Sequence, residues 1–131
     1  MTASHEKVVV KAEKAPKAIG PYSAGIQLGN LVFTSGQVAI DPATGNLVSG
    51  GIEAETRQVL TNIKNILEAA GSGMDLIVKT TVFLRDMSDF ALMNPVYAEF
   101  FGENPPARTT LQAAALPKGG ALEIDAIAYI P

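Results

Sequence analysis

Two charged residues in the C-terminal part of the sequence, Arg108 and Glu123, carry the side chains best suited to chemistry. Arg108 follows Pro105-Pro106-Ala107 at the start of an expected strand, so prolines stiffen its approach. A guanidinium grips a carboxylate through a planar fork of donors, and a glutamate shielded from bulk water can position water or move a proton. If the two strands are neighbours, these side chains line one cleft. The alternative is an interface salt bridge without chemistry.

Four further positions have both a functional and a purely structural interpretation. Tyr22 lies on a proline-rich loop, where it could form an aromatic wall of a ligand site or pack on the surface. Ser35-Gly36 could present backbone amides and a hydroxyl to an anion, or form a strand bulge. Asn94 could orient a ligand or cap a helix. Phe90 is expected in the core.

The composition excludes several kinds of catalytic site. The chain has no cysteine, which removes disulfides, thiolate zinc sites and cysteine nucleophiles. Its one histidine, His5, lies close to the start, so histidine-based catalysis is largely removed too. No spacing of residues is typical of a metal site, and we expect no metal and no cofactor. The net charge of −3 argues against a dedicated nucleic-acid binder, which usually shows a basic face.

The length of 131 residues indicates a single domain, 1–131. With 47% hydrophobic and 18% charged residues, the chain is expected to fold around one core. No segment approaches the roughly 20 apolar residues that a membrane span needs, and the polar N-terminus is unlike a signal peptide. We therefore expect a cytoplasmic protein with no membrane partner.

The hydrophobic pattern predicts six short strands, over residues 8–10, 25–28, 31–34, 76–84, 109–113 and 122–130. Gly29-Asn30 is typical of a two-residue hairpin turn between the second and third strands. The nearly uncharged run 76–84 is typical of a central strand buried on both faces.

Two helices are expected between these strands. Apolar residues recur at helical spacing from Ile52, and Gly71 supplies the stop. The second helix is expected to include residues 90–101. Pro95 is best tolerated in a first turn, so the main part of that helix is expected to start near Asn94.

The resulting order, β-β-β-α-β-α-β-β, predicts an α+β fold with a mixed sheet of about six strands and both helices on one face. On the last strand, Glu123, Asp125, Ile127 and Tyr129 point away from the helices. This face is too apolar for bulk water and too charged for a core. We therefore expect an oligomer built through the sheet.

Several separated motifs resemble the Rid family, whose RidA-type members are reactive-intermediate (2-iminobutanoate/2-iminopropanoate) deaminases. The motifs are Ala18–Ser23, Val32–Gln37, Asn94–Tyr97, Pro106–Arg108, Ala115–Gly119 and Leu122–Ile124. They occur in the family's order and extend over essentially the whole chain. The resemblance therefore identifies the chain as a member of this family.

The resemblance implies a chorismate-mutase-like fold in which three subunits pack their sheets into a barrel. Helices lie outside, and a ligand cleft lies at each subunit junction of the homotrimer. The implied activity is hydrolysis of reactive 2-enamines and 2-imines, such as 2-aminoacrylate, to 2-keto acids and ammonia. The implied partners are thus small imine and enamine acids.

Two residues carry the implied chemistry. Arg108 matches the position that grips the substrate carboxylate, and Glu123 matches the acidic residue beside the attacking water. The enzyme would then be a hydrolase acting on carbon–nitrogen bonds.

The remaining site residues come from the same resemblance. Tyr22 and Asn94 match cleft positions, Ser35-Gly36 matches the strand whose backbone faces the ligand, and Phe90 matches part of the apolar wall. Thr110 stands where some RidA-type relatives have cysteine, so no thiol at this position can be an obligatory nucleophile.

Two other functions stay open on the sequence alone. One is a non-catalytic trimer that binds or senses carboxylate ligands through Arg108. The other is an RNA-cleaving translation inhibitor, a role attached to some relatives. The acidic balance and the lack of a catalytic histidine argue against it.

Overall fold

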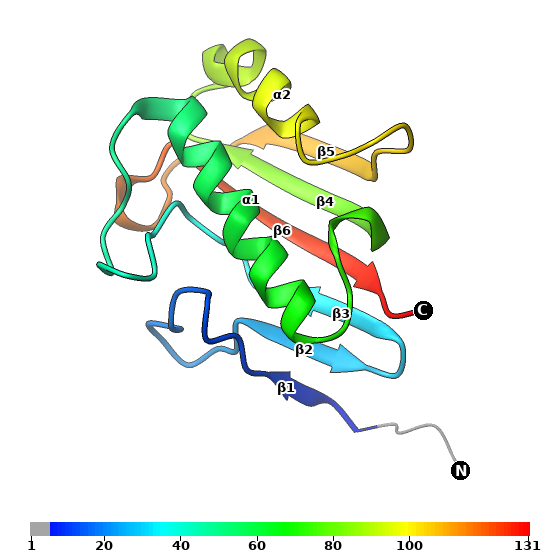
Figure 1. Ribbon diagram of the computed structural model, residues 1–131. Coiled ribbons are helices and arrows are strands. Elements are labelled where there is room, and N and C mark those ends of the chain that lie inside the picture. The colour runs from blue at the N-terminus through cyan, green and yellow to red at the C-terminus, as the bar shows by residue number, and fades with distance from the viewer. Residues whose placement is uncertain (1–5) are drawn as a thin grey trace.

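The computed structural model describes residues 6–131, which form a six-stranded sheet with helices across it (Figure 1). His5 lies outside the described residues. The strands run in the order β1-β2-β3-β6-β4-β5, and only β4 and β5 are parallel. Their bounds are β1 Val8–Val10, β2 Gly25–Leu28, β3 Leu31–Thr34, β4 Ile77–Leu84, β5 Ala107–Gln112 and β6 Leu122–Tyr129. The mixed α+β sheet expected from the sequence is thus confirmed.

The strands that carry Arg108 and Glu123 are not neighbours. β4 lies between β5 and β6 and pairs with both. Thr80 of β4 is opposite Arg108, whereas Phe83 of β4 is opposite Glu123. The sequence order of the strands does not reveal that β4 lies between β5 and β6. The helical connection between β4 and β5 allows these two strands to pair in parallel, which leaves the other edge of β4 for β6.

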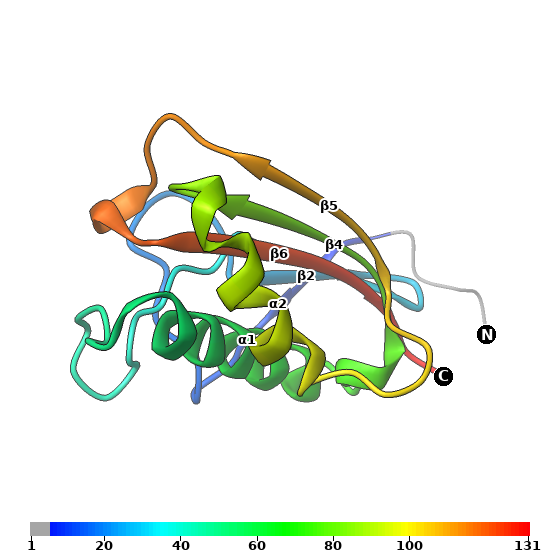
Figure 2. The same cartoon turned by 90° about the horizontal axis from the view of Figure 1, so that it is seen from above.

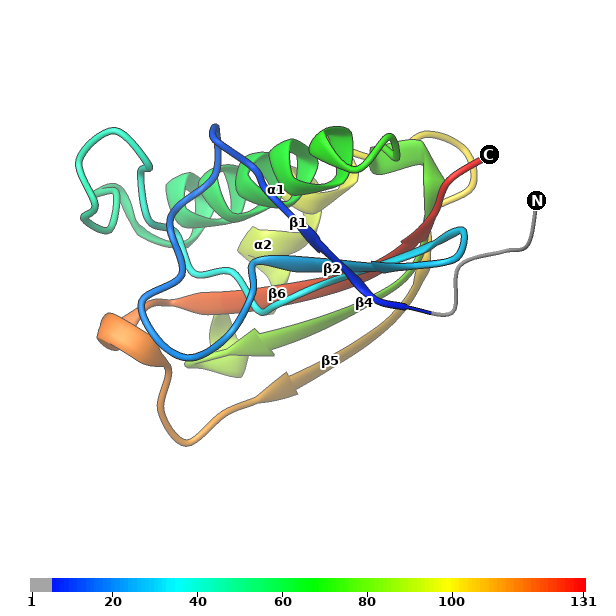
Figure 3. The same cartoon turned by 90° about the horizontal axis from the view of Figure 1, so that it is seen from below.

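Both helices lie on one face of the sheet, as Figures 2 and 3 show from opposite sides. α1 spans Gly51–Ala69 and packs on α2 and across β6 and β3, while α2 spans Phe90–Ala98. The predicted start and stop of α1 are confirmed. Gly71 has a φ of +86°, and the Ser72 amide donates to the Leu67 carbonyl at 2.8 Å, which closes the helix end.

The expected start of α2 near Asn94 is wrong. α2 begins at Phe90, after a 3-10 turn (η2, Met87–Asp89) in which the Asp86 carboxylate accepts from the Ser88 amide. Pro95 is therefore the sixth residue of the helix. It removes one helical hydrogen bond, and burial of Met93, Val96 and Tyr97 in the core offsets that loss.

The expectation that β4 is buried on both faces is also wrong for a single chain. Thr80, Val82 and Leu84 are buried under the helices, but Lys79, Thr81 and Phe83 on the opposite face are only half-buried. The whole helix-free face is similar. Its exposed large side chains are Val9, Leu28, Leu31, Phe33, Leu111 and Tyr129.

A bulge follows β3 and shapes the region next to Glu123. Phe33 pairs with Ile127, and Gln37 forms a bridge with Ile124. The chain therefore advances four residues after β3 while β6 advances three, which places one extra residue in the bulge. Thr34 Oγ1 fills part of the gap by accepting from the Ala126 amide at 3.0 Å. The bulge interpretation of Ser35-Gly36 is thus confirmed, as is the hairpin at Gly29, where φ is +59°.

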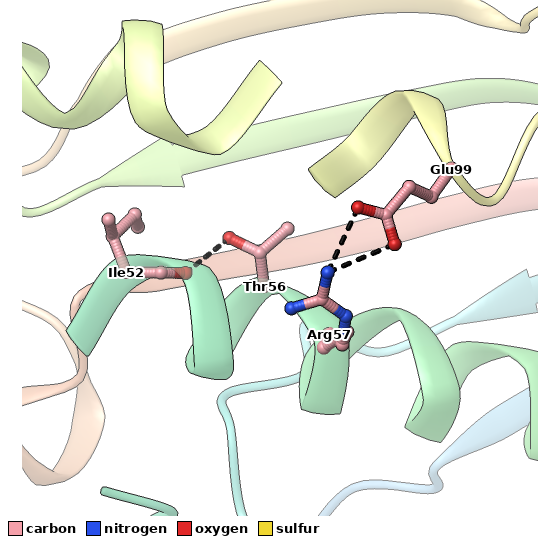
Figure 4. Close-up of polar contacts among 4 residues, drawn as sticks. All are labelled: Ile52, Thr56, Arg57 and Glu99. Carbon is pink, nitrogen blue, oxygen red and sulfur yellow. Dashed lines mark hydrogen bonds and ion pairs between the residues drawn. The ribbon is translucent and has the colours of Figure 1, made fainter. Parts of the chain in front are cut away.

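The two helices are also joined at the surface. Figure 4 shows Arg57 of α1 donating to both carboxylate oxygens of Glu99, which follows α2. Both side chains are about half exposed, so this pair contributes little to stability. Within the described residues, no helix is both long and apolar enough to cross a bilayer.

Candidate active site

The guanidinium of Arg108 lies on two aromatic rings of α2. Its Cζ atom is 4.7 Å from the centroid of the Tyr97 ring and 5.4 Å from that of Phe90. Within residues 6–131 it forms no ion pair with a carboxylate. A guanidinium held by cation–π contacts, with no carboxylate partner, can still donate hydrogen bonds to an anion.

The Tyr97 side chain is held in place by a hydrogen bond to β4. Its hydroxyl shares a 2.8 Å hydrogen bond with Oγ1 of Thr80, the residue of β4 opposite Arg108. Burial raises the pKa of Tyr97, while the Thr80 bond and the positive charge of Arg108 act in the other direction. The phenol therefore stays neutral and holds the ring beneath the guanidinium.

A cavity of about 490 Å³ opens beside Arg108. Its lining is mainly apolar, with polar groups from Asn94 and Arg108. The carbonyl oxygen of the Asn94 side chain is buried and has no hydrogen-bond partner, and the same holds for Oγ1 of Thr110. Buried polar atoms are normally paired, so these two oxygens are candidates for ligand contacts.

Glu123 lies in a different place, beside the bulge. It lines a cavity of about 50 Å³ together with Tyr22, Gly36, Gln37 and other residues of the surrounding loops. This volume is enough for a water molecule. A Cβ atom added to Gly36 would overlap the Glu123 carboxylate and lie 2.7 Å from its Cδ, so only glycine allows this approach.

The Glu123 carboxyl is held in an environment that disfavours its charge. Burial raises its pKa above the ordinary value of 4.5, and the negative charge of Asp125 on the same face raises it further. Burial also raises the pKa of Asp125, against hydrogen bonds from Thr81 and the charge of Lys79. A carboxyl with a raised pKa is suited to accept a proton near neutral pH.

Tyr22 and Ser35 make their own polar contacts on this side. The Tyr22 hydroxyl accepts from the Ile19 amide at 3.3 Å, and its side chain is largely exposed over the cavity. The Ser35 hydroxyl donates to the Ser23 carbonyl at 2.6 Å, and its amide donates to the Ala24 carbonyl at 2.8 Å. Ser35 thus anchors the Tyr22 loop to the bulge.

The predicted site residues therefore form two groups in one chain. Arg108, Phe90, Asn94 and Thr110 gather between β5 and α2, on the helix face of the sheet. Tyr22, Ser35, Gly36 and Glu123 gather around the bulge.

The two groups do not meet within one chain. Arg108 shares the face of Thr80, whereas Glu123 shares the opposite face with Phe83. Their partners on β4, Thr80 and Phe83, are three residues apart, which is about 10 Å along the strands. Their own strands, β5 and β6, are two strand spacings apart, which is about 10 Å across the sheet. An Arg108–Glu123 salt bridge inside one chain is therefore excluded.

Sequence reasoning missed Tyr97 as part of the site. Its place on an apolar helix face indicated only a core residue, and the stacking on Arg108 depends on β5 lying under α2. It also missed the role of Gln37, whose backbone bridges Ile124 beside Glu123. Within residues 6–131, no three His, Cys, Asp or Glu side chains cluster to hold a metal ion.

Comparisons with known proteins find a matching family model and similar sequences. Residues 12–130 match the family model described as endoribonuclease L-PSP. A RutC family protein of Pyrococcus horikoshii is 56% identical over 123 residues, covering 94% of this chain and 98% of the relative. The 2-iminobutanoate/2-iminopropanoate deaminase of Bos taurus is 49% identical over 120 residues, covering 92% and 88%.

Solved structures give the same relationship. RidA from the Antarctic bacterium Psychrobacter sp. superposes with a TM-score of 0.91 at 46% identity, covering 94% of this chain and 99% of that one. The E. coli TdcF structure, described as having bound serine, gives 0.90 at 43% identity, covering 95% and 99%.

Proposed function

The chain belongs to the endoribonuclease L-PSP (YjgF/RutC/Rid) family, and from that premise we propose that it is a cytoplasmic imine deaminase. The reaction is hydrolysis of reactive 2-imines and 2-enamines, such as 2-aminoacrylate, to 2-keto acids and ammonia. The relatives named as 2-iminobutanoate/2-iminopropanoate deaminases support this activity. All of residues 1–131 act as one domain.

The observation that carries the proposal is that Arg108 has no carboxylate partner within residues 6–131. A cation held on two rings, without an internal carboxylate and beside a cavity of about 490 Å³, is suited to a small carboxylate ligand. The serine in the related TdcF structure is a ligand of this class.

In the proposed mechanism, Arg108 binds the carboxylate of the imine tautomer and leaves its C2 atom facing a water next to Glu123. Glu123 removes a proton as the water oxygen bonds to C2, and the imine nitrogen takes up a proton. The resulting carbinolamine passes its hydroxyl proton to the amine as the carbon–nitrogen bond breaks, which releases ammonia and the 2-keto acid. General-base assistance contributes about 10²- to 10⁴-fold, which suffices for a substrate that already hydrolyses in water.

We further propose that each site forms between two subunits of a homotrimer. The two groups of residues lie on opposite faces of one sheet, so Arg108 of one subunit must meet Glu123 of another for both to act on one molecule. The exposed apolar side chains of the helix-free face give the subunits a surface to bury.

The test is ammonia and keto-acid release from freshly generated 2-aminoacrylate. Wild type should exceed the spontaneous rate, while Arg108→Ala and Glu123→Gln should lose most of that excess. Hydrolysis at the spontaneous rate, with tight binding of 2-keto acids retained, would instead support the carboxylate sensor. Cleavage of RNA that survives Arg108→Ala in nuclease-free preparations would support the RNA-cleaving alternative.

A further inference from the structure

Two buried polar residues of α1 bond to backbone outside the helix. Glu55 is 9% exposed, and its Oε1 atom accepts from the Ala121 amide at 2.9 Å. Asn62 is fully buried, and its Nδ2 donates to the Ile40 carbonyl at 2.9 Å and to the Val38 carbonyl at 3.4 Å. Burying such groups is costly unless they are bonded, and apolar residues would pack this helix face without that cost. Their placement therefore needs a reason.

The bonded segments lie on either side of Glu123. Ala121 precedes Glu123 by two residues, and Val38 follows Gly36 by two. Between these points, Gln37 and Ile124 exchange two backbone hydrogen bonds, of 2.8 and 3.1 Å. That bridge sets Gly36 against the Glu123 carboxylate. The two α1 side chains thus fix the backbone at both ends of the contact.

Ala121, directly before β6, is bonded through both its amide and its carbonyl, once to a side chain and once to a backbone amide. Its amide is held by Glu55, and its carbonyl accepts from the Arg85 amide at 2.9 Å. Just before it, the Arg85 side chain donates to the Gly119 carbonyl at 2.6 Å. These hydrogen bonds hold the peptide groups of the turn in place. They therefore limit the movement of β6, which begins at Leu122.

We infer that Glu55 and Asn62 are positioning residues for Glu123, through the two backbone segments that confine its carboxylate. The inference rests on the proposed role of Glu123 as the base. A general base must lie within hydrogen-bond reach of the water that it activates, and a misplacement of about 1 Å costs as much as 10²-fold in rate. Side chains from a long, rigid helix provide that precision.

The same segments shield the Glu123 carboxyl from water. The charged groups near this region are Asp125 on β6, Lys17 on the loop before Tyr22, Arg85 after β4, and Glu55 itself on α1. Burial is the first cause of the raised Glu123 pKa, and Asp125 is the second. Loosening the segments would admit water and bring the pKa of Glu123 down toward 4.5.

The experiment compares two substitutions of Glu55 in the full-length protein. Glu55→Gln keeps an acceptor oxygen for the Ala121 amide, whereas Glu55→Met keeps the length of the side chain and removes the acceptor. Thr56→Val is the matched control. Thr56 is the adjacent, fully buried residue, and its hydroxyl donates at 2.7 Å to Ile52 of the same helix, so it tethers no other segment (Figure 4).

Two readouts are measured. The first is the pKa of Glu123 by carboxyl-carbon NMR, with its signal assigned as the one missing from Glu123→Gln. The second is kcat and KM for deamination. Glu55→Met should lower the Glu123 pKa and reduce kcat by about tenfold, with a smaller change in KM. Glu55→Gln and Thr56→Val should leave both readouts near wild type.

An unchanged Glu123 titration in folded Glu55→Met would overturn the inference, and so would an equal effect in Thr56→Val. If Glu55→Met does not fold, Asn62→Leu serves in its place with the same expectations. The titration needs no turnover. A shifted Glu123 pKa in a protein without any deaminase activity would therefore overturn the proposed function and leave the positioning role standing.

Discussion

The chemistry available to this chain depends first on how Arg108 is held. Its guanidinium lies over the Tyr97 and Phe90 rings and forms no ion pair within residues 6–131, so it can donate hydrogen bonds to a planar anion. A lysine ammonium has neither the flat face nor the fork. The site thus distinguishes between two side chains of equal charge.

Replacing Arg108 with Lys should therefore remove most of the carboxylate recognition. Loss of a bidentate charged contact costs about 1.5–3 kcal/mol, which corresponds to about 10- to 150-fold in kcat/KM. Steady-state kinetics on 2-aminoacrylate measure the effect, which should fall mainly on KM. Arg57→Lys is the control, because neither Arg57 nor its exposed partner Glu99 lines the cavity beside Arg108. Equal losses in both variants would contradict the assignment.

The raised pKa of Glu123 predicts where activity is lost on acidification. The active form is the carboxylate, and burial raises the pKa above 4.5, so kcat/KM should begin to fall at a higher pH than an ordinary glutamate would give. The pH profile is measured after subtraction of the spontaneous hydrolysis rate. In Glu123→Gln this acidic limb should be absent.

The same shift predicts an effect on stability that needs no substrate. A raised folded-state pKa stabilises the protonated form, so this contribution is present below pH 4.5 and is lost as the pH rises through the folded-state pKa. Glu123→Gln should therefore gain stability over wild type at neutral pH and lose that advantage below 4.5. Denaturation at both pH values checks the sign.

For single residues, the sequence predicted which side chains could do chemistry better than it predicted which side chains lie close together. The proline-stiffened arginine and the glutamate opening the last strand were both visible, because their chemistry is carried by residue type. Their separation onto opposite faces was not visible, since it follows from β4 pairing between β5 and β6. Tyr97 was missed for the same reason.

Among the elements, α2 is linked to the sheet by a buried hydrogen bond. Tyr97 and Thr80 share the hydrogen bond that joins α2 to β4, and Thr80 is fully buried. Tyr97→Phe leaves the Thr80 hydroxyl without this partner and should cost about 1–3 kcal/mol in the free energy of unfolding. Urea denaturation measures that loss.

A double substitution separates the bond from general packing. Adding Thr80→Val to Tyr97→Phe removes both polar partners and should recover part of the lost stability, because two apolar groups of similar shape can pack without a bonding deficit. A double variant whose loss equals the sum of the two single losses would show that the hydrogen bond contributes nothing of its own.

The bulge after β3 makes a different prediction. Gly36→Ala places a Cβ against the Glu123 carboxylate, so the side chain must move although the backbone at Gly36 is not in the left-handed region. Deaminase activity should fall by about tenfold or more, with the thermal midpoint little changed. Gly73→Ala is the matched control, since its added Cβ meets only the mobile end of Asp75, at 3.2 Å.

Most elements could be predicted because their signals are local. The Gly29 turn, the α1 stripe and the stop at Gly71 each depend on nearby residues. The start of α2 was wrong because packing of Met93 and Tyr97 outweighed the preference of Pro95 for a first turn. The two-sided burial of β4 was wrong for one chain because its second face has no covering layer there.

For the whole molecule, that uncovered face is the feature that links structure to activity. Leu31, Phe33 and Tyr129 are all more than a third exposed there, beside Asp125 and Glu123. A monomer rarely presents so continuous an apolar surface without a partner. If subunits cover it, the same contact brings the Glu123 group of one chain toward the Arg108 group of another.

Subunit mixing tests this arrangement directly. Arg108→Ala and Glu123→Gln should each retain little activity alone. Co-refolded mixtures should regain activity, because a mixed ring contains a junction with an intact arginine and an intact glutamate. With random assembly of equal amounts into trimers, each mixed trimer has one intact junction, so about a quarter of the wild-type sites return. A mixture that assembles, as shown by mass spectrometry of mass-tagged subunits, and yet stays inactive would mean that both residues act within one chain or that the site is wrongly assigned.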